Sequence, residues 1–161
     1  MGKRRRGRMP AYKTLLSWAK PKSEGVECRH ELKVPVFQVL HHDHLVNFAL
    51  DKLHDRYDAR DLSVKWQSLL LQLKHVVMDP VWICNKCNEQ DGALKADWYK
   101  AEPWFVEQYM SLPHSCLTEL FEEKEAAGLK AMRAKASALV ATERKRHDAT
   151  KSEIEALIKS L

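Results

Sequence analysis

Residues 81–92 read VWICNKCNEQDG, and this stretch constrains the fold more than any other. The run VWIC has the composition of a short strand, and it leads directly into the cysteine pair Cys84 and Cys87. A turn ending at Gly92 follows, before a helical pattern. A C-x-x-C pair in an intracellular chain indicates either metal binding or redox chemistry, and the absence of a thioredoxin-like strand–helix context favours metal.

A second polar cluster, LHHDH at residues 40–44, ends another β-type run. The β-branched and aromatic residues between positions 34 and 39 predict a strand that runs into the histidines. Each cluster alone is ambiguous, because a histidine-rich segment can be a polar surface turn and lone C-x-x-C pairs are common. The combination is more specific, because Asn88 directly follows the second cysteine.

The sequence predicts helices for most of the rest of the chain. Residues 11–20 predict a short amphipathic helix, and residues 45–57 predict another. A third, over 61–77, is expected to begin at Asp61 as N-cap. From about residue 117 one or two long helices are expected, with Gly128 as the main breaker and residues 150–152 as a second candidate boundary. The third helix is expected to bury one apolar stripe: Val64, Leu69, Leu70, Leu73 and Val77.

The two clusters together resemble the HNH (His-Me finger) endonucleases, in particular the branch of recombination endonuclease VII, which is often phage-encoded. In that branch a strand ends in a D-H-D-H type motif, and a second segment reads C-x-x-C-N before a turn and a helix. The likeness covers about residues 25–100. It implies an α+β, mostly helical fold, in which a ββα-metal hairpin carries a helical insertion over 45–80 and a long C-terminal helix follows.

This resemblance also implies a division of the chain. Residues 1–22 would form a basic N-terminal arm with a short helix, 23–112 the nuclease domain, and 113–161 a helical extension.

Phosphodiester hydrolysis needs an activated water and relief of charge at the phosphate, which an imidazole base and one hard cation can supply. The resemblance makes His42 the general base and gives His41 and Asn88 the catalytic cation, Mg²⁺ or Mn²⁺. His44 matches a trailing histidine with a catalytic contact to phosphate or metal, and Asp43 matches an acid of the same motif that is a further metal candidate.

Two points about this motif stay open. His41 stands where the family usually has Asp, a substitution that favours Mn²⁺ or another transition metal over Mg²⁺. A shifted register, with Asp43 as ligand and His44 as base, is the rival assignment, because Asp-His is the commoner pair. The remaining alternative is that the histidine cluster is a polar surface turn with no catalytic role.

A structural zinc is expected beside the catalytic cation. Cys84 and Cys87 supply one half of the knuckle that the family uses to hold its small hairpin. Upstream, Gly25 stands where the first cysteine of the other half would fall, so Cys28 and His30 are the candidates there. Cys116 is a more distant candidate. Without a fourth ligand, packing alone would hold the hairpin.

The chain has 161 residues and a net charge of +5, a balance that favours polyanionic partners such as DNA. It contains no apolar run that could cross a membrane. The alternatives to nucleic-acid contact are a solvated tail and a solvated helix face. The basic residues expected to contact nucleic acid are Arg4, Arg5, Arg6, Arg8, Lys95, Arg144, Lys145 and Arg146.

The leading hypothesis is therefore a metal-dependent DNA endonuclease that nicks DNA or cuts both strands, as a homing or junction-processing enzyme, in the cytoplasm of a host cell if the gene is phage-borne. A single HNH site cuts one strand, so double-strand cleavage would require two subunits, and the C-terminal helix is the candidate for homodimer contacts. The alternative is a catalytically inactive HNH-fold module for zinc and DNA binding or for assembly.

Overall fold

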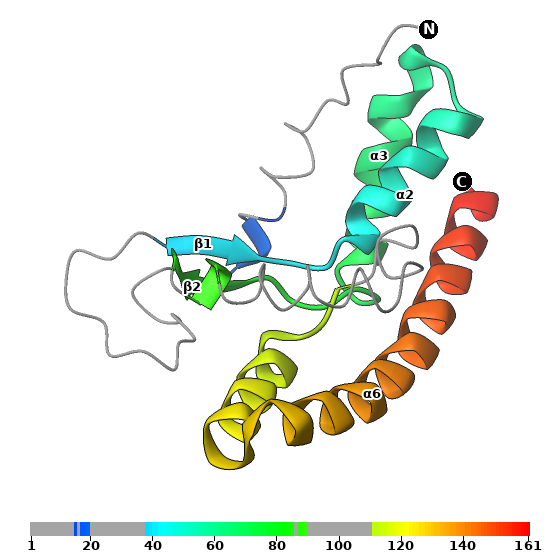
Figure 1. Cartoon of the computed structure of the whole chain (residues 1–161). Coiled ribbons are helices and arrows are strands. Elements are labelled where there is room, and N and C mark those ends of the chain that lie inside the picture. Colours follow the sequence, from blue (N-terminus) through cyan, green and yellow to red (C-terminus); the bar gives the residue numbers. More distant parts are fainter. Residues whose placement is uncertain (1–14, 16, 20–37, 86, 90–110) are drawn as a thin grey trace, which may run out of the picture.

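The computed structural model describes residues 15, 17–19, 38–85, 87–89 and 111–161. The elements along the chain are listed in order: β1 (Gln38–His41), α2 (Leu45–Arg56), α3 (Ala59–Leu73), β2 (Val81–Cys84) and α6 (His114–Ser160). Figure 1 shows the two short strands side by side, with α2 and α3 beyond one end of the sheet and α6 running past it toward the C-terminus. This part of the chain confirms a mostly helical α+β fold with a small antiparallel sheet.

The sheet pairs the two strands that the sequence singled out. His41 lies opposite Val81, and Gln38 lies opposite Cys84. Because the strands run antiparallel, the histidine segment leaves the sheet at one end and the cysteine pair leaves it at the other. At about 3.4 Å per residue, the two ends are roughly 10 Å apart.

Helix α3 begins earlier than the sequence analysis predicts. Its N-cap is Asp58, whose side chain accepts hydrogen bonds from the N–H groups of Arg60 (2.9 Å) and Asp61 (3.3 Å). The prediction of Asp61 as the cap was therefore wrong. An acid in the first turn of a helix also interacts favourably with the positive end of the helix dipole, and the two roles have similar sequence signals.

One of the residues predicted to lie on the buried face of α3 is exposed instead. Leu69, Leu73 and Val77 are buried as expected, but Val64 is 68 % exposed. Trp66, three residues before Leu69, faces the core instead. The spacing 66, 69, 73 follows the period of a helix, whereas position 64 lies on its opposite side.

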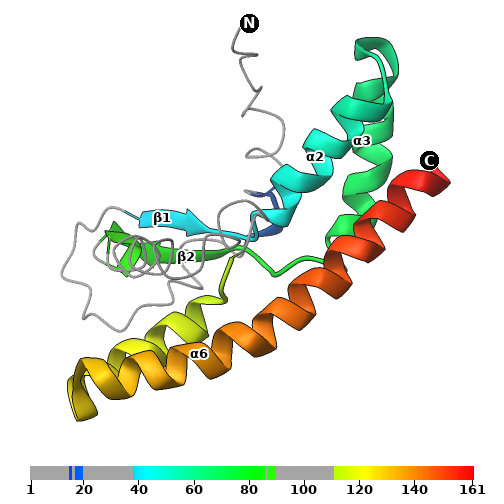
Figure 2. The ribbon, with the colours of Figure 1, turned by 45° about the vertical axis from the view of Figure 1, so that its right-hand side comes forward.

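The main core lies where α2, α3, the sheet and the end of α6 meet. Apolar side chains of α2 and α3 pack there against Leu40 of β1, Trp82 of β2 and Leu15 near the N-terminus. The last turns of α6 close it with Ile154 and Ile158. Figure 2 shows the C-terminal part of α6 running beside α2 and α3, as the contacts of α6 with both helices require.

Helix α6 is a hairpin of two helical arms. Gly128 breaks it with a φ of 83° and a ψ of 179°, and the chain reverses there (Figure 1). A second apolar cluster, including Leu117, Leu120 and Met132, joins the two arms. Lys135 of the second arm forms a salt bridge with Glu119 of the first at 2.9 Å.

The hydrogen bond to Glu119 raises the pKa of Lys135 above its ordinary value, so the ammonium stays charged at neutral pH. The expected boundary at residues 150–152 was wrong, because the second arm is helical through this segment.

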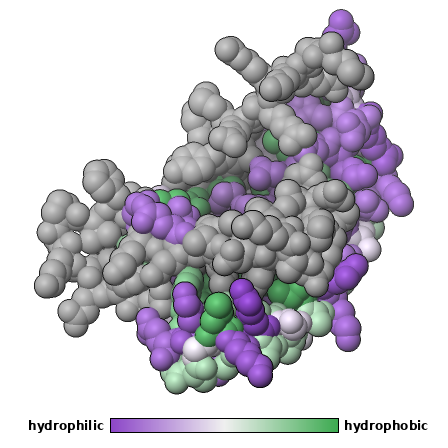
Figure 3. Space-filling view, viewed as in Figure 1, coloured by the Kyte–Doolittle hydropathy of each residue, from purple (hydrophilic) through white to green (hydrophobic). Residues whose placement is uncertain are grey.

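Hydrophilic side chains cover most of the visible surface over α2 and α3, and apolar and polar side chains alternate over the α6 hairpin (Figure 3). Within the described ranges, no helix has both the length and the apolar character that a membrane crossing would need.

Replacing Gly128 with alanine is expected to lower the free energy of unfolding by about 1–3 kcal/mol, because non-glycine residues rarely adopt this backbone conformation. A Cβ at this position would meet no atom within 4 Å, so the cost comes from the backbone alone. Urea denaturation measures the change, with Lys130→Ala, an exposed substitution two residues away, as the control. Equal stability of the two variants would contradict the strained turn.

Candidate functional site

The histidine segment, residues 41–44, alternates between the interior and the surface. His41 and Asp43 are buried, with 8 % and 0 % of their surface exposed, whereas His42 and His44 are half-buried. This alternation is what an extended segment at the end of a strand produces. The rings of His42 and His44 lie with their centroids 5.4 Å apart. One pair of side chains is therefore buried in the interior, and the other pair is partly accessible.

His42 has the hydrogen bond that a histidine base requires. Its Nδ1 lies 3.2 Å from the carbonyl oxygen of Leu40, two residues back in β1. Because a carbonyl can only accept, Nδ1 carries the proton and the lone pair of the neutral ring is on Nε2. The backbone thus fixes both the tautomer and the orientation of this imidazole.

His41 is held by the segment that precedes α6, whereas His42 is held by β1. Its Nε2 donates to the carbonyl oxygen of Leu112 at 2.9 Å, and its ring lies 5.9 Å from that of His114. The backbone N–H of His44 donates to Ser111 Oγ at 3.0 Å. In the neutral ring this places the lone pair of His41 on Nδ1, so any metal ligation by this residue would use Nδ1.

Asp43 joins three parts of the fold. Its Oδ1 accepts the N–H of Leu45 at the start of α2 (3.0 Å), and its Oδ2 accepts the N–H of Met78 before β2 (3.2 Å). Arg146 of α6 places Nη1 3.7 Å from Oδ2 and also pairs with Glu143 at 2.6 Å. A fully buried carboxylate needs such partners, because an unpaired charge in the interior is costly.

Cys84 and Cys87 lie at the other end of the sheet. They are 3 % and 1 % exposed and form a small apolar cluster with Ile83. The N–H of Cys87 donates to Cys84 Sγ at 3.3 Å. A hydrogen bond donated to sulfur favours the thiolate, the form that binds zinc, so this turn suits one half of a knuckle.

Cys116 fits a zinc site less well than the cysteine pair does. It packs beside the cluster of the α6 hairpin, whereas Cys84 and Cys87 belong to a different cluster. Burial raises the pKa of the Cys116 thiol above its ordinary value, and the carboxylates of Glu143 and Glu119 raise it further. The thiol is therefore protonated at neutral pH.

Asn88 is half-buried in the helical residues that follow β2, where Asn85 Nδ2 donates to Glu89 Oε1 at 2.6 Å. Within the part of the chain that the structure describes, no three His, Cys, Asp or Glu side chains converge on a point that could hold a metal ion. The sheet brings the strands of the two motifs together, and the shared cation site stays a prediction.

The basic residues divide into three groups. Arg144 and Lys145 are exposed on α6, as nucleic-acid contact requires. Arg146 instead directs its guanidinium to Asp43 and Glu143, so its main role in the fold is structural. Several predicted site residues lie outside the described ranges: Arg4, Arg5, Arg6, Arg8, Cys28, His30 and Lys95.

Sequence reasoning missed the residues that hold the histidine segment from behind. Ser111, Leu112 and His114 contact it across 67 or more positions of the chain. No local pattern marks such a contact, because it arises only when the segment before α6 and the start of α6 pack against the histidine segment. The ion pair between the buried Asp43 and Arg146 was missed because it also joins residues far apart in the sequence.

Comparisons of the chain with protein-family models, with curated proteins and with solved structures give no match.

Replacing Asp43 with alanine is expected to lower the free energy of unfolding by about 2–4 kcal/mol, because it orphans two backbone donors that each cost roughly 1–3 kcal/mol when buried and unpaired. Thermal or urea unfolding measures the loss. The matched control is Asp79→Asn, a change at an exposed acid close by in sequence, which should have little effect. A mild effect at Asp43 would show that its contacts contribute little.

If the cysteine pair holds zinc, elemental analysis of the purified chain should find stoichiometric zinc. Cys84→Ala should lose the metal, since one thiolate ligand is gone, and Cys116→Ala should retain it. Metal-free wild-type protein would contradict the knuckle. Equal loss in the Cys116 variant would place the fourth ligand on α6.

Proposed function

We propose that this protein is a metal-dependent DNA endonuclease of the HNH type that hydrolyses a phosphodiester bond with His42 as general base. The observation that carries the proposal is the hydrogen bond from His42 Nδ1 to the Leu40 carbonyl at the end of β1. It holds one half-buried imidazole in the tautomer that accepts a proton at Nε2. The strand beside it, β2, leads into the C-x-x-C-N motif.

The base would act on a water molecule at the outer side of the histidine segment. An imidazole has its pKa near neutrality, so the neutral ring is available to take a proton under ordinary conditions. His44, whose ring is 5.4 Å from that of His42, would contact the same phosphate. Hydrogen-bond donation from its ring would orient the phosphate toward the water.

The catalytic cation would be held by His41 and Asn88. When bound, it supplies charge relief at the phosphate and at the leaving oxygen. An imidazole nitrogen and an amide oxygen suit a transition-metal ion such as Mn²⁺ better than Mg²⁺. For Asn88 to reach the ion, the helix that begins at Asn85 must run back along the sheet toward His41.

The alternative register, with Asp43 as metal ligand and His44 as base, is less well supported. Both carboxylate oxygens of Asp43 accept backbone hydrogen bonds, and Arg146 pairs with one of them. Ligating a cation would require this fully buried side chain to give up contacts that hold three parts of the fold. The proposal therefore keeps His41 and His42 in the roles of ligand and base.

A second candidate function is a non-catalytic module that binds DNA or assembles with other proteins. The observation in its favour is the inward direction of His41, whose Nε2 is engaged by the Leu112 carbonyl. A ligand turned toward the interior, at a position where the family usually has Asp, suits a site that has lost its metal. In that case DNA binding would persist without cleavage.

The proposal predicts that the protein nicks supercoiled plasmid with Mn²⁺ and that His42→Ala lowers the rate by about 10²–10⁴-fold, the usual contribution of a general base. DNA binding should be unchanged, because the role proposed for this ring is in the chemical step and not in binding. His75→Ala, at an exposed histidine between α3 and β2, is the matched control and should retain full activity.

Two results would contradict the hypothesis that the protein is an endonuclease with His42 as its base. Wild-type protein that binds DNA but never cuts it, with Mn²⁺ or Mg²⁺, would support the non-catalytic module. A His42→Ala variant as active as the His75→Ala control would remove His42 from the mechanism.

A further inference from the structure

The second arm of α6 carries an excess of positive charge over residues 129–147. This part of the helix contains six basic side chains and one acid, Glu143. Lys135 is neutralised by its salt bridge to the first arm, and Arg146 is neutralised by Glu143 at 2.6 Å. The other four basic side chains are exposed: Lys130, Arg133, Arg144 and Lys145.

The four exposed cations lie on the part of the helix surface that the first arm leaves uncovered. Arg133 and Arg144 are eleven residues apart, close to three full turns, so they project in nearly the same direction. Lys130 and Lys145 lie within about a third of a turn of that line. Met132, by contrast, is buried in the cluster that joins the two arms.

Short side chains separate the two pairs of cations. The hydroxyl group of Ser137 donates to the carbonyl oxygen of Arg133 at 3.2 Å, and that of Thr142 donates to the carbonyl oxygen of Ala138 at 3.2 Å, so both lie close to the backbone. A polyanionic surface can therefore approach the helix closely between the cations. The exposed residues between Arg133 and Arg144 are Ala134, Ser137, Ala138, Ala141 and Thr142.

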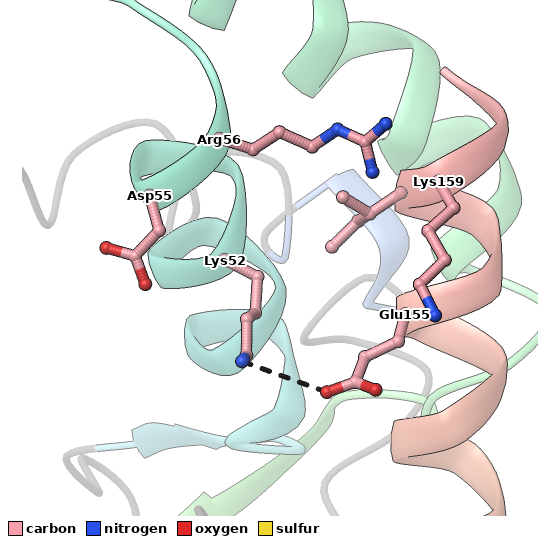
Figure 4. A pocket seen from close by; sticks show the side chains of 6 residues that line it. Lys52, Asp55, Arg56, Glu155 and Lys159 are labelled. Atoms are coloured by element: carbon pink, nitrogen blue, oxygen red, sulfur yellow. Dashed lines mark ion pairs between the residues drawn. The ribbon is translucent and has the colours of Figure 1, made fainter.

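The hollow of about 530 Å³ between α2 and α6 has a different charge pattern (Figure 4). Asp55 and Glu155 line it together with Lys52, Arg56 and Lys159. Lys52 Nζ lies 3.8 Å from Glu155 Oε1, and the ammonium of Lys159 lies on the side of Glu155 (Figure 4). Acids offset bases in this hollow, whereas residues 129–147, all of which the structure describes, include no fully exposed acid.

The spacing of the cations suits the major groove of duplex DNA. Arg133 and Arg144 are about 17 Å apart along the helix axis, at 1.5 Å per residue. The major groove is about 12 Å wide and admits one α-helix. A helix lying in it would bring long basic side chains near both of its ends within reach of the phosphates on the two walls.

We propose that the basic face of α6, formed by Lys130, Arg133, Arg144 and Lys145, lies in the major groove and contacts phosphates on both walls. This inference rests on the proposed function for its partner, duplex DNA. Such contacts fix the position of the duplex without reading its sequence, and the short side chains between them lie against the base edges. The exposed Asp148 marks the end of the basic face, because an acid repels phosphate.

The first test is the salt dependence of binding to a labelled 30-base-pair duplex, measured by fluorescence anisotropy in EDTA so that no cleavage occurs. Each phosphate contact contributes about −0.9 to the slope of log K against log salt concentration. The double variant Arg133→Gln with Lys145→Gln should therefore flatten the slope by about two. Both positions are exposed and glutamine is a good helix former, so the fold should persist, which circular dichroism checks.

The matched control is Arg60→Gln with Lys74→Gln, which removes the same two kinds of charge from exposed positions of α3. The inference is overturned if the variant of the basic face binds with the wild-type slope. It is also overturned if the control flattens the slope as much, because net charge alone would then explain the effect. Wild-type protein that does not bind duplex DNA overturns it as well.

The second test concerns the close approach between the cation pairs. Ala141→Leu leaves the charge unchanged but lengthens an exposed side chain there, and it should weaken binding about tenfold, the usual cost of one misplaced groove contact. Ala156→Leu, at an exposed alanine of the same helix beyond Asp148, is the control and should bind as wild type does. Equal affinities of the two variants would overturn the placement of this face in the groove.

Plasmid nicking by the wild-type protein with Mn²⁺ separates this inference from the proposed function. A flattened slope in the variant of the basic face without any nicking by wild type would refute the endonuclease and support the basic face. Nicking by wild type with unchanged slopes would refute the basic face and leave the endonuclease standing.

Discussion

One buried carboxylate joins the histidine segment to three other parts of the fold. Asp43 has no exposed surface, and its two oxygens bind the first turn of α2, the loop that leads into β2, and Arg146 of α6. These contacts come from segments 2, 35 and 103 positions away in the chain. Since Asp43 lies between His42 and His44, fixing Asp43 also fixes the backbone that carries those two rings.

The sheet supplies the second constraint. Pairing of β1 with β2 carries the histidine segment and the cysteine pair to opposite ends of one short ladder, although two helices separate them in sequence. Two strands of four residues form a thin sheet that cannot be stable alone. Leu40 and Trp82 stabilise the sheet by joining the main core. The small cluster around Cys84 stabilises its other end, and a zinc ion bound there would add the most stability.

Local patterns in the sequence predicted most elements, because helix period, strand composition and glycine breaks are properties of neighbouring residues. The run VWIC and the break at Gly128 are examples. The same patterns failed at the start of α3, where Asp58 and Asp61 are both suitable N-cap residues and the sequence does not say which one caps the helix. They also failed at Val64, because the predicted apolar face of α3 was rotated relative to the face that is buried. The support of the site by Ser111, Leu112 and Arg146 could not be predicted, since it depends on how α6 docks.

The central claim is that His41, held in the histidine segment, and Asn88, after the cysteine pair, bind one cation. The most direct measurement is a titration of isotope-labelled protein with Mn²⁺, whose unpaired electrons broaden nearby NMR signals. The account predicts that the imidazole signals of His41 and His42 and the side-chain amide signal of Asn88 broaden together, at the same substoichiometric Mn²⁺. An Asn88 amide signal that stays sharp while the histidine signals broaden, or no selective broadening at all, would contradict it.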